Sequence, residues 1–189
     1  MAKRIGSKTL ILSSSPSIIG YAAVGAKKEK QGPLAGYFDL LSDDSSFGQK
    51  TWEKAETHMQ KTAIELALQK CNTQKDQIDF LFAGDLLNQC ISSAYASRDM
   101  LIPFFGLYGA CSTMSESLCL ASMFVDTGLG QRCLAATSSH FCSAERQFRF
   151  PLEYGGQRTP TAQWTVTGSG ACVVAPSAQA PFVPASYTH

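Results

Sequence analysis

The sequence predicts an α/β domain with a mainly parallel sheet. Runs of continuously apolar residues alternate along the chain with patterns of helical period, as in parallel sheets whose strands are buried on both faces. A Gly-Ala-Cys turn at residues 109–111 separates one of these apolar runs from a long helical pattern. The chain has 189 residues, of which 44% are hydrophobic, so it can bury one core and we expect one domain.

The N-terminal part is expected to hold short strands followed by an amphipathic helix. Apolar runs lie on both sides of a Ser/Pro turn, and a segment rich in glycine and proline follows them. A helical pattern comes next, because Ala55, Met59, Ala63 and Leu66 recur on one face. The expected elements are strands at 9–12 and 18–24, a loop at 25–44, a helix at 50–70 and a strand at 78–83.

The central helix follows Cys111 and is apolar on nearly all sides, which is typical of a buried helix. The last residues are rich in proline, alanine and serine and are expected to form a loose tail. We therefore place a domain at 1–175 and the tail at 176–189. The expected elements of this part are helices at 88–98, 112–126 and 144–150, strands at 103–107, 132–137 and 164–174, and a loop at 154–160.

Composition excludes several classes of partner. The net charge of +1 gives no bulk attraction to nucleic acid, so no nucleic-acid partner is expected. The seven cysteines contain no CxxC pair, and the three histidines are too scattered to complete a zinc motif. An odd number of cysteines within apolar runs indicates a reducing, intracellular compartment. No run is long enough for a transmembrane helix, and no cofactor is expected.

Cys111 is the strongest candidate for a functional residue. It lies where the turn meets the first turn of the following helix, beside unpaired N–H groups and the positive end of the helix dipole. Both favour a thiolate, and acyl-transfer enzymes place a cysteine nucleophile in such a position. The alternative is a small buried cysteine that only fills space.

Other polar residues follow neighbouring strands. Asp85 comes shortly after the strand at 78–83, and Ser138, Ser139 and His140 directly follow the strand at 132–137. Ligands of parallel sheets bind at the carboxyl ends of strands, so we expect these residues to surround one cleft with Cys111. Asp85 and the serines could instead cap helices, and His140 could be a hydrogen-bonded structural histidine.

A series of short runs resembles the stage V sporulation protein AD family of spore-forming bacteria. The turn at 109–113 alone also resembles the wider superfamily of thiolases and ketoacyl synthases, whereas the ordered series is specific to the family. The runs are KEKQGPL at 28–34, AGDLLNQ at 83–89, GACST at 109–113, AATSSH at 135–140, AERQFR at 144–149, EYGGQ at 153–157 and TVTGSGA at 165–171.

The resemblance implies a thiolase-like fold and a function without catalysis. The family is understood to bind dipicolinic acid (pyridine-2,6-dicarboxylate) or its calcium chelate, for uptake into the developing spore. Other stage V sporulation proteins at the spore inner membrane are its expected partners, which implies a location at the periphery of that membrane in the forespore. By motif match, Asp85, Cys111 and His140 would bind the ligand, and Asp85 could reach calcium through the chelate.

The chain differs from the superfamily in its extent. A thiolase-like fold has two similar halves, and only the first is expected here, with the second half absent. Enzymes of this type take the catalytic His or Asn partners of the cysteine from the second half. The alternative function is a thioester-dependent acyltransferase with Cys111 as nucleophile, and a folded half-domain without a ligand is a third. Uncovered apolar surface predicts a homo-oligomer, paired through the strand at 132–137.

Overall fold

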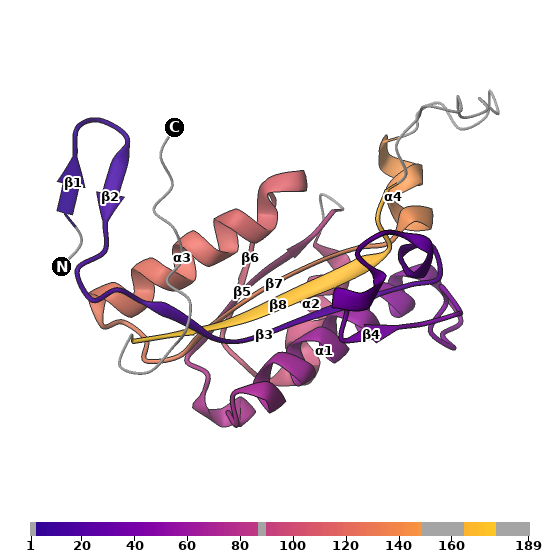
Figure 1. Ribbon diagram of the computed structural model, residues 1–189, viewed down its shortest axis with the longest axis horizontal. Helices are drawn as coiled ribbons and strands as arrows, with labels where there is room; N and C mark the ends of the chain where they lie inside the picture. Colours follow the sequence, from indigo (N-terminus) through magenta and orange to yellow (C-terminus); the bar gives the residue numbers. More distant parts are fainter. Residues whose placement is uncertain (1–2, 87–89, 149–164, 177–189) are drawn as a thin grey trace.

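The computed structural model describes residues 3–86, 90–148 and 165–176 and shows a six-stranded sheet with helices on both faces (Figure 1). The strand order is β4-β3-β8-β7-β5-β6, and β1 and β2 form a separate hairpin. The strands are β1 (Lys3–Ile5), β2 (Thr9–Ile11), β3 (Ser17–Gly25), β4 (Leu40–Leu41), β5 (Phe80–Asp85), β6 (Phe104–Gly106), β7 (Cys133–Ser139) and β8 (Gly168–Ala175). The α-helices are α1 (Trp52–Lys70), α2 (Ile91–Met100), α3 (Thr113–Thr127) and α4 (Phe141–Phe148).

The predicted fold class is confirmed, because helices flank a sheet in which most strands run in one direction. The pairs β3–β4, β5–β7 and β5–β6 are parallel. Strand β8 is antiparallel to both of its neighbours, β3 and β7. Because β3, β5 and β7 run in the same direction, their carboxyl ends lie on one side of the sheet, where the antiparallel strand β8 begins.

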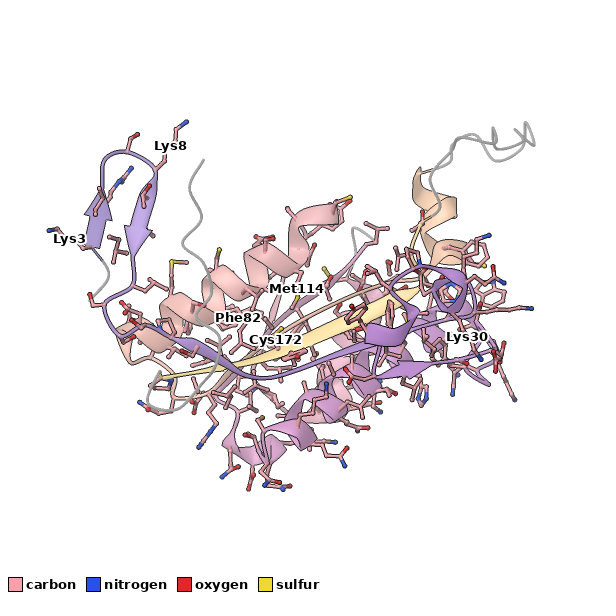
Figure 2. All side chains as sticks on the ribbon, viewed as in Figure 1. Lys3, Lys8, Lys30, Phe82, Met114 and Cys172 are labelled. Carbon is pink, nitrogen blue, oxygen red and sulfur yellow. The ribbon has the colours of Figure 1, made fainter. Side chains whose placement is uncertain are left out.

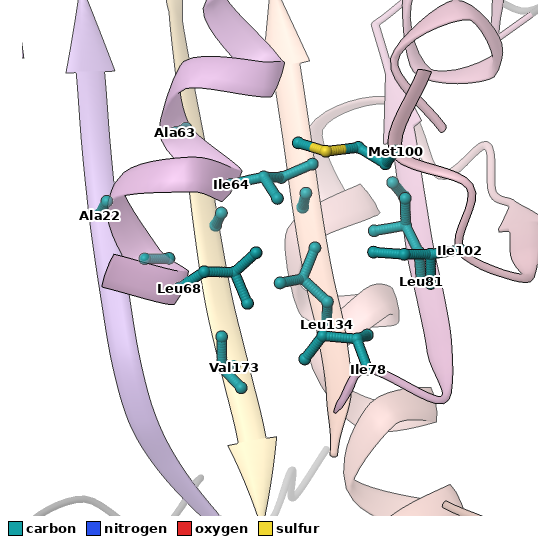
Figure 3. Close-up of a cluster of buried hydrophobic side chains, with 14 of the residues drawn as sticks. Ala22, Ala63, Ile64, Leu68, Ile78, Leu81, Met100, Ile102, Leu134 and Val173 are labelled. Atoms are coloured by element: carbon teal, nitrogen blue, oxygen red, sulfur yellow. The ribbon is translucent and has the colours of Figure 1, made fainter. Parts of the chain in front are cut away.

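Helices α1 and α2 cover one face of the sheet, and their apolar side chains form the larger core (Figure 3). Thr51 caps α1, since its hydroxyl accepts a hydrogen bond from the Lys54 N–H. The buried stripe of α1 includes Met59, Ile64 and Leu68, which pack against Leu81, Leu134 and Val173 of the sheet. This stripe confirms the amphipathic helix predicted at 50–70.

Helix α3 covers the opposite face and begins two residues after Cys111 (Figure 1). It packs against Phe82, Ala135 and Val174 to form a second core. The sequence predicted burial on nearly all sides, and this is wrong for the outer face, where Cys119 is exposed. The apolar residues extend around the helix, but no other described element covers the side that points away from the sheet.

Strand β7, which corresponds to the strand predicted at 132–137, lies inside the sheet. It pairs with β5 along one edge and with β8 along the other. A strand whose hydrogen-bonding edges are both occupied cannot pair with a second chain, so the predicted dimer contact through this strand is wrong. The two edge strands of the sheet are β4 and β6.

The β1–β2 hairpin projects beyond the sheet, with Lys3 and Lys8 on its outer parts (Figure 2). The strand predicted at 9–12 therefore pairs with residues upstream of it and not with the main sheet. No helix in the described ranges is both long enough and apolar enough to cross a membrane. The predicted loop at 154–160, most of the tail at 176–189 and Trp164 lie outside the described residues.

Candidate functional site

The turn between β6 and α3 presents Cys111 at the protein surface. Residues Ala110–Ser112 form one turn of 3-10 helix, which Ala110 enters with a positive φ of 47°. The Thr113 hydroxyl locks this turn, because it donates to the Ala110 carbonyl at 2.9 Å and accepts from the Gly109 N–H at 3.1 Å. A Cβ at Gly109 would lie 2.6 Å from the Ser112 Oγ and 2.7 Å from a Glu116 carboxylate oxygen, so both side chains would have to move to admit a larger residue. Cys111 is exposed, which excludes the alternative of a buried, space-filling cysteine.

A cavity of about 690 Å³ opens beside Cys111, at the edge where the parallel strands end. Hydroxyl groups, backbone and apolar side chains form its walls, and none of its described lining residues is charged at neutral pH. The lining residues are Ala23, Phe38, Leu86, Ala110, Cys111, Thr137, Ser138, Ser139, Thr165, Val166, Gly168, Ser169 and Gly170.

Asp85 is buried on the other side of the sheet from Cys111. Its carboxylate accepts hydrogen bonds from the N–H of Ser93 at 2.9 Å and from the Ser93 hydroxyl at 3.0 Å. Ser93 belongs to α2, which lies on the same face of the sheet as α1. Gly84, the residue before Asp85 in β5, instead faces Thr113 of the Cys111 turn on the other side. Alternate residues of a strand point to opposite faces, so Asp85 contributes no described surface to the cavity.

His140 is also buried and is not a lining residue of the cavity. Its Nε2 lies 2.9 Å from the Ser45 carbonyl, and its Nδ1 accepts the Cys142 N–H at 3.2 Å. The ring stacks on Trp52 at 5.1 Å. Burial lowers the pKa of His140, which favours the neutral ring that donates from Nε2. The structure therefore brings Cys111 to the cavity and places Asp85 and His140 in buried, hydrogen-bonded positions.

Sequence reasoning missed Glu56, a fully buried carboxyl on α1. Its two oxygens accept hydrogen bonds from Ser138 and Ser143, each at 3.0 Å. Burial and the nearby Asp85 charge raise the pKa of Glu56 to about 7. The signal was present in the sequence, because Glu56 and Gln60 recur at the same spacing as Ala63 and Ala67 on the buried stripe.

No described group of three or more His, Cys, Asp or Glu side chains is arranged to hold a metal ion. All seven cysteines are free. Cys133 and Cys172 are poor nucleophiles, because burial raises the pKa of these thiols to about 12 and about 11. A second hollow, of about 620 Å³, lies between α1 and α2, and its lining includes Lys54, Lys61, Tyr95, Arg98 and Asp99.

Solved structures show where this architecture occurs elsewhere. A 3-oxoacyl-[acyl-carrier-protein] synthase III from Aquifex aeolicus superposes on 87% of the chain with a TM-score of 0.59 and 18% identity. The match covers 55% of that synthase. A variant of OleA from Xanthomonas campestris superposes on 90% of the chain and 60% of OleA, with a TM-score of 0.58 and 14% identity. At such identities the likeness shows a shared thiolase-like fold.

Sequence comparison is more specific. A stage V sporulation protein AD of Bacillus subtilis is 48% identical over 172 residues, which are 91% of this chain. The chain spans about half of that relative, since the match covers 51% of its length. The sequence model of the family described as stage V sporulation protein AD matches residues 6–188. The chain therefore belongs to the stage V sporulation protein AD family.

Proposed function

We propose that this chain is a sporulation protein without catalytic activity that binds dipicolinic acid, or its calcium chelate, in the cavity beside Cys111. The observation that carries the proposal is the uncharged, hydroxyl-lined wall of that cavity. The volume of about 690 Å³ lies in the range of small-molecule sites and exceeds what one pyridine ring with two carboxyl groups needs. Membership of the family supports a role in sporulation.

The charge of the cavity favours the calcium chelate over the free dianion. A dianion that enters an uncharged cavity loses hydration without gaining a cation, whereas the one-to-one chelate with calcium is neutral. Asp85 is not needed for this preference, because it is buried against Ser93 on the other side of the sheet. Affinity is expected to be weak, about millimolar, because the cavity is poorly enclosed.

The site geometry also supports a function without acyl transfer. A cysteine nucleophile needs a base within hydrogen-bond reach. The described cavity wall contains neither histidine nor carboxylate, and both ring nitrogens of His140 lie at hydrogen-bond distance from backbone groups. Exposure of Cys111 and the likeness to synthases favour acyltransferase activity as the second candidate function.

The expected setting is the periphery of the spore inner membrane in the forespore, with other stage V sporulation proteins as partners. This part of the proposal rests on the family alone. Because the chain spans half of its relative, the ligand and partners of the longer protein are proposed here for this half only.

Titration calorimetry with dipicolinate, with and without calcium, tests the proposal. Gly170→Leu should abolish binding, because a side chain at Gly170 meets only the Ala22 carbonyl, at 3.9 Å, and can extend into the cavity. Gly36→Leu is the matched control, because the space around Gly36 is open and lies outside the cavity wall. Equal binding by the wild type and Gly170→Leu would show that the ligand does not use this cavity.

A second variant separates the two explanations of a calcium effect. If the neutral chelate is the preferred ligand, Asp85→Asn keeps the preference for calcium. If Asp85 bridges to the metal, the same variant loses that preference. Loss of the calcium effect in Asp85→Asn would contradict the neutral-chelate argument.

A further inference from the structure

Glu56 links two elements that flank the wall of the Cys111 cavity. Ser138, the donor to its Oε1, is near the end of β7, and Ser143, the donor to its Oε2, is in the first turn of α4. Thr137, Ser138 and Ser139 all line the cavity. One carboxyl on α1 therefore holds the β7–α4 turn, residues 139–142, from the side opposite to α3.

The surroundings of Glu56 penalise its negative charge. Asp85, fully buried on β5, lies in register with Ser138 and is the charged neighbour that acts on Glu56. The other polar groups near it are hydroxyls: Ser138 from β7 and Ser143 from α4 donate to it, whereas the Ser92 hydroxyl from α2 has no hydrogen-bond partner among the described residues. Two carboxylates in one dry site repel each other, and this repulsion adds to the cost of burying the Glu56 charge. The carboxyl therefore holds a proton until the solution is close to neutral.

Gln60 is a second buried polar side chain of α1, one helical turn beyond Glu56. Its Nε2 donates to the Gly84 carbonyl and to the Ser93 hydroxyl, each at 3.2 Å. Its Oε1 is buried and accepts no hydrogen bond from a described residue. Side chains four residues apart on a helix are neighbours, so Gln60 lies next to Glu56 on the buried stripe of α1.

We propose that Glu56 is the positioning residue of the cavity wall: protonated, it holds the β7–α4 turn closed, and its ionisation promotes local opening of that turn. The consequence for ligand rests on the proposed function. Binding in the cavity should weaken as pH rises through neutrality, because Thr137, Ser138 and Ser139 lose their fixed positions. Glu56 acts through Ser138 and Ser143 and makes no contact with the cavity itself.

Linkage gives the size and sign of the effect. A carboxyl with a pKa of about 7 in the closed turn and 4.5 in water binds more protons when the turn is closed. Opening that exposes Glu56 therefore becomes tenfold easier per pH unit across this window, roughly 300-fold in total. His140 works in the opposite direction, since its protonation at low pH would remove the acceptor of the Cys142 N–H.

Hydrogen exchange of backbone amides tests the proposal without a ligand. The reporters are the N–H groups of Phe141, Cys142 and Ala144, which donate to Thr167, His140 Nδ1 and the His140 carbonyl. After correction for intrinsic rates, their protection in the wild type should fall between about pH 5 and about pH 7. In Glu56→Gln, whose neutral side chain has one acceptor and one donor group as the protonated carboxyl does, the fall should be absent. Because the wild type and Glu56→Gln both contain His140, the ratio of their exchange rates reports the effect of Glu56 ionisation alone.

Two further variants separate charge from packing. Glu65→Gln, an exposed position of the same helix paired with Lys75, should leave the profile unchanged. Ser143→Ala removes the contacts of this hydroxyl with Glu56 and with the His140 carbonyl but keeps the Glu56 carboxyl, so it should speed exchange at every pH and keep the slope. Identical pH profiles for the wild type and Glu56→Gln would overturn the proposal. Absence of dipicolinate binding at every pH would contradict the proposed function, while the exchange ratio still decides the role of Glu56.

Discussion

Asp85 and Cys111 show how strand alternation decides the chemistry of single residues. Asp85 is the last residue of β5 and Cys111 lies in the turn after β6, so both are at the carboxyl ends of strands. Asp85 nevertheless contacts Ser93 on the α1 face, whereas Cys111 precedes α3, which covers the other face. A shift of one residue in register exchanges the two faces. The sequence predicted which strand ends would meet but not the face on which each side chain lies.

We predict that Cys111 does not accept an acyl group. The thiol is exposed, so a small alkylating reagent should reach it, but the described cavity wall contains no base to take its proton. Incubation with acetyl-CoA followed by intact-mass measurement should show no stoichiometric adduct. An adduct that disappears in Cys111→Ser would contradict this prediction and favour the acyltransferase.

We also predict that Glu56 makes the folded protein less stable as pH rises. Its pKa is about 7 in the folded state and 4.5 without burial, so the native state binds more protons between these values. The free energy of unfolding should therefore fall from about pH 4.5 to about pH 7 and level off above, by about 3 kcal/mol from this group. Urea unfolding of the wild type and Glu56→Gln at several pH values measures the difference.

At the scale of elements, the spacing of apolar residues was sufficient to predict the long helices. The helix predicted at 50–70 is α1 at Trp52–Lys70, and the helix predicted at 112–126 is α3 at Thr113–Thr127. Strand order could not be predicted, because the position of β8 between β3 and β7 depends on contacts distant in sequence. The hydrogen bond between Glu56 and Ser138 could not be predicted for the same reason, because the two residues are 82 positions apart in the sequence.

Gly84 shows how one element positions another. A Cβ at this residue of β5 would lie 2.1 Å from the Leu107 carbonyl oxygen and 2.7 Å from Thr113 Cγ2. We predict that Gly84→Ala forces the Cys111 turn away from the sheet and destabilises the protein by roughly 1–3 kcal/mol. Gly36→Ala, where the space is open, should change stability by less than about 0.5 kcal/mol. Similar urea midpoints for both variants would show that the turn can move without loss.

At the scale of the molecule, one edge strand of the sheet, β6, is left without cover by the described residues. Strand β6 pairs only with β5, and its other hydrogen-bonding edge is unpaired within the described part of the chain. Three large apolar side chains before, within and after β6 are exposed: Leu101 by 90%, Phe105 by 44% and Tyr108 by 40%. Exposed apolar side chains beside an open strand edge are typical of an interface.

We therefore predict that the chain self-associates through the β6 edge and not through β7. Leu101 provides a test that does not damage the fold, because it has a positive φ of 59° at the end of α2, a conformation that favours glycine. Leu101→Gly should leave thermal stability equal or higher and should weaken association. Leu34→Gly, at another exposed leucine far from β6 in sequence, is the control.

Light scattering at tens of micromolar should give a mass above the 20.3 kDa of one chain for the wild type. A wild type that remains monomeric, or a Leu101→Gly variant that associates as strongly as the wild type, would rule out this edge as the contact.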